Sequence, residues 1–302
     1  MDVSCLALWL MCAAIGSEST LVEVQMRHVT LHIDSAVVLE IRHMRAQMAP
    51  THGNQPVTFD DSRSFVMRIR TAEIAIDTAT LSELLNHHVF AYPGAPLKNL
   101  SIQIEQGRVR EKGTLHKGVD LPFEIEGTLD VTPDGWIRLH TDSVKSAHVP
   151  FKGLLHFFGA DLSRLVNLKQ DRGVRLEGDD ILLDPKRMLP PPQISGKVTA
   201  VRLEGDKIVQ IFGSDAHDGL SLPHPAEAYI YHRGGSIRFG KLTMTDSDLE
   251  IVNESGGAWF DFSLPEYNRQ LVAGYSKNTP SHGLIVFMPD FRSLKPGTLK
   301  TR

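Results

Sequence analysis

Residues 113–131 read GTLHKGVDLPFEIEGTLDV and residues 150–159 read PFKGLLHFFG, and these two stretches decide the fold. The first stretch alternates between apolar and polar residues and turns at glycines, which is typical of β-strands. Asp134-Gly135 follows shortly after it and is a strong hairpin signal. Residues 97–147 are therefore predicted to form a meander in which consecutive strands pair antiparallel.

The second stretch opens an apolar helix, which is predicted over residues 151–168. Its apolar residues recur at helical spacing and form one broad stripe. Gly153 and Gly159 interrupt the helix, each at a cost of roughly 1 kcal/mol against alanine. Two interpretations of the stripe remain open: a helix packed as ordinary core, or a helix that lines a lipid cavity. The stripe comprises Phe151, Leu154, Leu155, Phe158, Leu162, Leu165 and Val166.

Another helix is predicted upstream of the meander, over residues 77–92. The letters TLSE at residues 80–83 match a capping box, and Pro93-Gly94 ends the periodic pattern. Adjacent residues on a helix point about 100° apart, so His87 and His88 are not expected to share a metal ion. One apolar stripe runs along this helix and is formed by Leu81, Leu84, Leu85 and Val89.

Strands are predicted on both sides of these elements. Residues 21–45 and 64–76 alternate with a period of two. The letters VRLEGD occur twice, at 174–179 and 201–206, and predict two hairpins that turn at Glu-Gly-Asp. The chain from residue 214 onward shows further short strands. The predicted fold class is α+β: a curved, mostly antiparallel β-sheet wrapped around two apolar helices, with a β-rich C-terminal third.

The composition is that of a globular protein of 302 residues, enough for one large hydrophobic core or two ordinary ones. Apolar residues make up 41% of the chain and charged residues 23%. The formal net charge is −4 and both signs are interspersed, so a nucleic-acid partner is not expected, because such proteins carry a basic stripe. Both cysteines, Cys5 and Cys12, lie near the N-terminus, which excludes a disulfide or a thiol nucleophile from the body of the chain.

The N-terminus resembles a signal peptide. Residues 5–16 form an apolar run that is too short to span a bilayer. Export is the favoured interpretation, although no lysine or arginine precedes this run. A wrongly assigned start codon or a buried N-terminal strand would explain that absence. Cys12 as a lipid-attachment site is a further alternative, although the bulky Met11 precedes it.

The signatures of common enzymes do not occur in the sequence. It contains no serine-nucleophile elbow, zinc-protease helix motif, phosphate-binding glycine loop or dinucleotide fingerprint. Glu124 and Glu126 are expected to share an exposed strand face rather than to act as an acid/base pair. A solvated loop is the favoured interpretation of the one cluster of metal-ligating residue types, so no metal or cofactor is expected. That cluster comprises Asp215, His217, Asp218 and His224.

Several short motifs follow one another in a distinctive order: LSELL at 81–85, GT at 113–114, GVDLPF at 118–123, GTL at 127–129, PDG at 133–135 and VPFKGLL at 149–155. In this order, residues 65–212 resemble a bacterial family of phospholipid-binding envelope domains related to the mycobacterial lipomannan-elongation accessory protein. That family is similar to tubular lipid-binding (TULIP-like) proteins, in which a curved antiparallel sheet wraps a helix and encloses an acyl-chain channel. The resemblance implies this fold and a phospholipid ligand, and it transfers no catalytic residues.

The predicted function is non-enzymatic binding or transfer of phospholipid, or of another acyl lipid, in the bacterial cell envelope, with a membrane surface as a second partner. Glycines within long apolar helix faces leave room for an acyl chain, whose burial gains about 0.8 kcal/mol per CH₂. Residues 1–19 are interpreted as a signal peptide, 20–213 as a lipid-binding-like α+β domain and 214–302 as a β-rich extension. The alternatives are a β-rich structural or interaction module with a solid core and no ligand, and, less favoured, an enzyme that uses the Asp215 to His224 loop. The side chains expected to line the cavity are Leu81, Leu85, Val89, Leu154, Leu155, Phe158 and Leu162.

Overall fold

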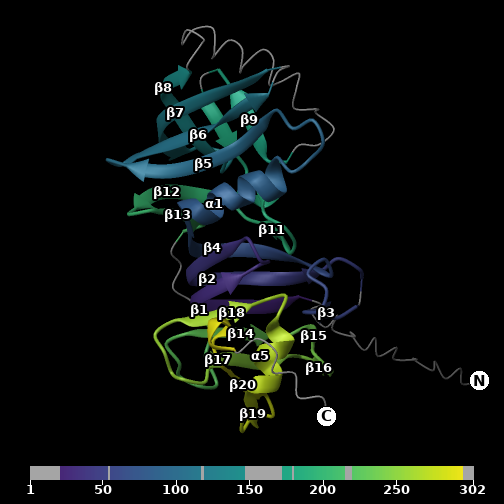
Figure 1. The fold of residues 1–302 in the computed structure, drawn as a ribbon. Coiled ribbons are helices and arrows are strands. Elements are labelled where there is room, and N and C mark those ends of the chain that lie inside the picture. The colour runs from purple at the N-terminus through teal and green to yellow at the C-terminus, as the bar shows by residue number, and fades with distance from the viewer. Residues whose placement is uncertain are drawn as a thin grey trace, which may run out of the picture.

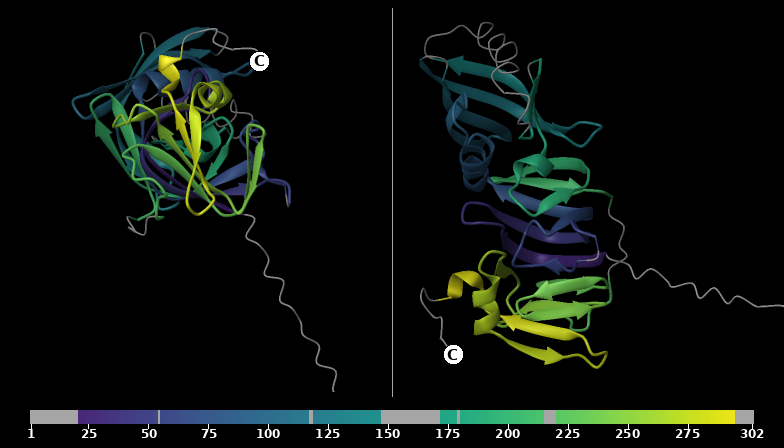
Figure 2. Two further views of the ribbon diagram at one scale, coloured as in Figure 1. Left: turned by 90° about the horizontal axis from the view of Figure 1, so that it is seen from below. Right: turned by 90° about the vertical axis from the view of Figure 1, so that its right-hand side faces the viewer.

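The structure is a computed structural model, and the residues it describes are 21–53, 55–116, 119–146, 172–178, 180–214 and 220–294. Within these ranges the protein is mostly β, and its strands follow one another along one long direction (Figure 1). Most neighbouring strands pair antiparallel, and viewed from below they curve around that direction instead of forming a flat layer (Figure 2). The predicted curved, mostly antiparallel sheet is confirmed.

An eleven-stranded sheet forms the body of the molecule. Nine strands follow one another in space and two short ones pair parallel to them at the side, β11 on β4 and β18 on β1. In spatial order the nine strands are β12 (Val198–Glu204), β13 (Lys207–Phe212), β4 (Phe65–Asp77), β2 (Val38–Pro50), β1 (Val22–His32), β14 (Tyr229–Arg233), β17 (Asp248–Asn253), β20 (Leu284–Met288) and β19 (Tyr275–Asn278), and the side strands are β11 (Gln193–Ser195) and β18 (Phe260–Ser263).

The long strands β1 and β2 confirm the alternating pattern seen in the sequence. Val24 and Met26 are buried in alternation, but the buried face continues at Val29 instead of at His28. His28 adopts a left-handed backbone conformation with φ of 50°. A residue in that conformation interrupts the pleat, so the side chains beyond it face the other way, and this accounts for the change of phase in the sequence.

A six-stranded sheet lies beyond the β12 end of the body (Figure 1). Its first four strands form the predicted meander, and the turns at Gln106-Gly107 and Asp134-Gly135 use left-handed backbone conformations. The two VRLEGD repeats form the predicted hairpins, β9–β10 in this sheet and β12–β13 in the body. In spatial order the strands are β5 (Leu97–Glu105), β6 (Arg108–His116), β7 (Asp120–Val131), β8 (Ile137–Ser146), β10 (Asp180–Leu183) and β9 (Val174–Glu177).

The predicted upstream helix is present as α1 (Thr78–Leu84), which continues into one π-helical turn, η1 (Leu85–Val89). The predicted capping box is wrong, because Asp77 caps the helix by accepting a hydrogen bond from the Thr80 backbone N–H at 2.6 Å. The Ile102 N–H donates to Ser82 Oγ at 2.9 Å, and the side chain of Asn86 pairs with both backbone groups of Leu100. These bonds hold α1 and η1 against β5.

Smaller elements complete the fold. The sequence did not predict the short helices α4 (Pro185–Met188) and α5 (Tyr267–Ala273), the 3-10 turn η4 (Phe291–Ser293) or the edge strand β19. A three-stranded sheet consists of β16 (Leu242–Thr245), β15 (Ser236–Phe239) and β3 (Val57–Thr58). The second apolar helix, predicted over residues 151–168, lies outside the described residues, so wrapping around two apolar helices is not confirmed.

The C-terminal third is β-rich, as predicted, and it is joined directly to the N-terminal strands. β14 pairs antiparallel with β1 over five residue pairs, and β18 pairs with the following part of β1. One continuous hydrophobic core contains both Val29 of β1 and Phe260 of β18. Hydrogen bonds and core therefore cross the predicted division at residue 213, which stays a prediction. Within the described ranges, no helix combines the length and the apolar character needed to cross a membrane.

Candidate functional site

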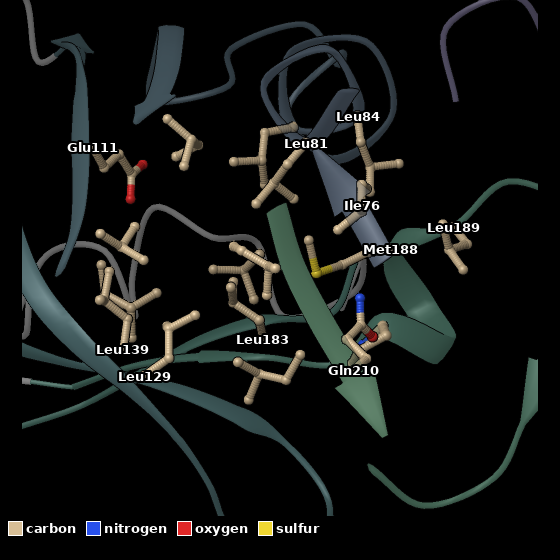
Figure 3. Close-up of a pocket in the computed structure, with 18 of the residues that line it drawn as sticks. Ile76, Leu81, Leu84, Glu111, Leu129, Leu139, Leu183, Met188, Leu189 and Gln210 are labelled. Atoms are coloured by element: carbon tan, nitrogen blue, oxygen red, sulfur yellow. The ribbon is translucent and has the colours of Figure 1, made fainter. Parts of the chain in front are cut away.

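An apolar cavity lies between α1, the inner face of the six-stranded sheet and the adjacent end of the eleven-stranded sheet (Figure 3). Its volume is about 90 Å³. An engineered apolar cavity of about 150 Å³ stays dry and binds benzene, so this smaller space suits a short apolar segment of a ligand. Its described lining comprises Leu39, Ile74, Ile76, Leu81, Leu84, Leu85, Phe90, Leu97, Ile102, Val109, Glu111, Phe123, Ile125, Leu129, Ile137, Leu139, Val174, Ile181, Leu183, Pro185, Met188, Leu189, Ile194, Ile208, Gln210 and Phe212.

The period of two in the strands explains why the walls are apolar. Along β7, Phe123 and Ile125 are buried on the inner face, while Glu124 between them faces outward. On the outer face Glu124 and Glu126 form ion pairs with Arg110, among others. The predicted charged strand face is therefore present on the outside of the sheet, and the inner face is left to aliphatic and aromatic side chains.

Two polar side chains, Glu111 and Gln210, occur among the described residues that line the cavity. They come from different sheets, since Glu111 lies on β6 and Gln210 on β13. Figure 3 places them at opposite ends of the labelled group of side chains. Leu189 lies near Gln210 in the same view, and both residues are only half-buried. Of the two polar side chains, Glu111 is therefore the buried one and Gln210 the one closer to solvent.

Glu111 is a carboxyl group in an almost wholly apolar environment. It is only 8% exposed, and its neighbours across the strands are Ile102 on β5 and Ile125 on β7. No described residue forms a hydrogen bond or an ion pair with its side chain. Burial raises the pKa of Glu111 from 4.5 to about 7, because the ionised form loses its hydration and gains no counter-charge.

The sequence contained a signal for Glu111 that the prediction missed. In residues 109–115, VREKGTL, the alternation of β6 places Glu111 on the same face as Val109 and Leu115, both of which are buried. When a strand carries a glutamate at a position that alternation assigns to its apolar face, that carboxyl group is expected to be buried. The neighbouring Arg110 and Lys112 concealed this signal, because together the three residues read as an ordinary charged surface run.

The predicted lining residues have different outcomes. Leu81 and Leu85 do line the cavity, whereas Val89 is buried in the core but does not belong to the described lining. Val89 as a ligand-contacting residue stays a prediction; it lies on the π-helical turn η1, which breaks the regular helical spacing from Leu85 onward. The remaining predicted lining residues lie outside the described residues: Leu154, Leu155, Phe158 and Leu162.

The predicted metal-type cluster is only partly described, since Asp215, His217 and Asp218 lie outside the described residues. His224 donates its backbone N–H to Glu250 at 2.8 Å. Within the described ranges, no group of three or more histidine, cysteine, aspartate or glutamate residues is arranged to hold a metal ion. On η1, the adjacent histidines reach different partners: His87 pairs with Glu83 and His88 with Asp34.

A second buried titratable group, His232, lies outside the cavity. It is fully buried on β14 opposite Leu249 of β17, and its ring packs edge-on against Phe59. The ring lies beside the backbone of Leu249, but neither ring nitrogen completes a hydrogen bond there. Burial lowers the pKa of His232 from 6.5 to about 4.

His232→Leu is expected to reduce the sensitivity of the fold to acid. A lowered folded-state pKa means that the unfolded chain binds the proton more tightly, so stability falls as the pH falls below 6.5. The wild type is expected to lose about 2 kcal/mol more than the variant between pH 7 and pH 5. Urea unfolding at both pH values measures the difference. Equal losses in the two proteins would contradict a buried neutral imidazole.

Comparison of the chain with protein-family models, curated proteins and solved structures found no match.

Proposed function

We propose that this protein binds an acyl lipid without catalysis, by holding one hydrocarbon chain in the cavity between α1 and the two sheets. The observation that supports this proposal is the lining, in which every described residue apart from Glu111 and Gln210 is apolar. Each CH₂ moved from water into such a site gains about 0.8 kcal/mol. Ligand sites of this kind combine apolar walls with a few polar anchors.

The cavity volume defines the form of ligand that we propose. A space of about 90 Å³ is smaller than the benzene-binding cavity, so it holds part of one chain of an acyl lipid and leaves the rest of the molecule outside. The predicted second helix, residues 151–168, remains part of the proposal as a further wall, on the basis of its apolar stripe in the sequence. We also propose the cell envelope as the location and a membrane surface as the source of lipid, because of the apolar run at residues 5–16.

Extraction with organic solvent tests the proposal most directly. Protein purified without detergent is expected to release an acyl lipid, detected by mass spectrometry, and emptied protein is expected to take up a single-chain probe such as 1-octanol. A clean extract together with no uptake of any chain would contradict lipid binding. That result would support the structural module with a solid core.

Leu81→Phe is expected to weaken chain uptake at least tenfold, because the larger ring fills part of the cavity. Leu81 lines the cavity, so the added volume enters empty space and unfolding stability should change little. Native mass spectrometry of 1-octanol uptake measures the effect on the folded fraction.

Leu115→Phe is the matched control, since Leu115 is 1% exposed on β6 and does not belong to the described lining. The same enlargement there overpacks the core and is expected to destabilise the fold by about 1–3 kcal/mol. Uptake per folded molecule should remain that of the wild type. If the two variants lost uptake equally, the cavity would not be the binding site.

A further inference from the structure

The carboxyl of Glu111 is the only ionisable group among the described residues that line the cavity. Its inward direction follows from the register of β6, where Glu111 lies between Ile102 and Ile125, and Figure 3 shows the carboxyl among apolar side chains. A leucine would pack in the same place without the cost of burying a polar group. A buried polar group without a partner therefore points to a ligand that supplies the partner.

We propose that Glu111 binds the polar end of the ligand, so that the cavity selects single-chain amphiphiles whose buried end is a hydrogen-bond donor without negative charge, such as a hydroxyl or an ammonium group. This inference rests on the proposed function, because it identifies the ligand class of the same cavity.

The charges around the cavity favour a donor over an anion. A carboxylate only accepts hydrogen bonds, and a protonated carboxyl both donates and accepts, so a hydroxyl complements either form. An anionic end, such as a carboxylate or a phosphate, would need a cation beside it. The described lining contributed by α1, η1, α4 and the strands of both sheets contains no lysine, arginine or histidine.

The cations nearest in sequence to Glu111 face the other way. Arg110 and Lys112 lie on the outer face of β6, where both pair with Glu124 of β7. They are therefore directed away from the cavity and are already neutralised. The polar end of the ligand is placed at the buried Glu111 end, and its chain extends along the apolar walls toward Gln210.

Four ligands of one chain length test the inference: 1-octanol, octylamine, octanoate and 1-methoxyoctane. The ether keeps the chain and the oxygen of the alcohol but has no donor hydrogen. Binding is measured by calorimetry at pH 7.5 on emptied protein. The wild type is expected to bind the alcohol and the amine about 10–100-fold more tightly than the ether, because a donor reaches an otherwise unpaired carboxyl. Octanoate is expected to bind more weakly than the alcohol.

Variants at residue 111 test whether this carboxyl causes the preference of the protein for ligands with a donor. Glu111→Leu should bind the alcohol and the ether equally, because it keeps the apolar walls and loses the acceptor. Glu111→Gln keeps an acceptor oxygen without the charge, so it should lose affinity for the amine more than for the alcohol. Leu115→Ile, a change of shape on the same strand at a buried residue outside the described lining, is the control and should retain the wild-type preference. Thermal melting confirms that each variant is folded.

The possible outcomes separate the two proposals. Uptake of all four chains with no preference for a donor, or a preference that persists in Glu111→Leu, would overturn the role of Glu111 and leave lipid binding intact. Failure of every chain to bind would contradict the proposed function, and this inference with it.

Discussion

Glu111→Leu is expected to make the protein more stable at pH 8, and the gain should be about 3 kcal/mol larger at pH 8 than at pH 4. The wild type buries this carboxyl in the cavity wall with a pKa raised from 4.5 to about 7. At pH 8 the ionised form must therefore be held in apolar surroundings without a counter-charge, and leucine removes that cost.

The sign of the effect follows from proton binding. Since the pKa of Glu111 is higher in the folded state, the folded protein binds a proton more tightly than the unfolded chain does. The corresponding stability is fully present below about pH 4.5 and is lost as the pH rises to about 7. Wild-type stability should therefore decline across this interval because of Glu111, and Glu111→Leu should lack that part of the decline.

Urea unfolding of both proteins at several pH values between 4 and 8 measures the difference. Glu250 must be controlled, because burial also raises its pKa to about 7 and it acts in the same direction. Glu250→Gln should leave the contribution of Glu111 unchanged, since Glu250 lies on β17 outside the cavity. A gain in Glu111→Leu that is the same at pH 4 and pH 8 would mean that the carboxyl is not buried as described.

A chain of residues 20–213 is expected not to form a stable monomer, although the sequence pattern suggests a division there. In the whole protein β1 is an interior strand, because β2 pairs with it on one side and β14 and β18 pair with it on the other. Without the C-terminal third, β1 becomes a long edge strand with unpaired backbone groups. The loss of Phe260 and Phe262 also uncovers part of the core, since both are fully buried in the same hydrophobic cluster as Val29.

Size-exclusion chromatography with light scattering, together with thermal melting, tests this expectation. A chain of residues 20–294 retains every described strand and is the control, which should give a cooperative melt. The shorter chain should aggregate or melt without cooperativity, because the free edge pairs with other molecules. A monomeric 20–213 chain with a cooperative melt would establish the predicted division as a true domain boundary.

Much of the local structure could be predicted from the sequence. Alternation identified β1, β2, β4 and the meander, and the VRLEGD repeats identified two hairpins. The cap of α1 was misplaced, because a capping box is a weaker constraint than the competing cap offered by Asp77 at the end of β4. Leu81 and Leu85, which belong to one helical stripe in the sequence, both line the cavity in the structure, and their contact with a ligand stays a prediction.

Long-range organisation was decided only in the tertiary structure. Nothing local indicates that β14, about two hundred residues after β1, pairs with it, because antiparallel partners are selected by the fit of whole strands. The same holds for the cavity, whose walls come from two sheets and a helix that are distant in the chain. The isolation of Glu111 is likewise a tertiary property. Its inward direction follows from the period of β6, but the absence of a partner among the described residues depends on the elements that face it, whose described side chains in the lining are apolar apart from Gln210.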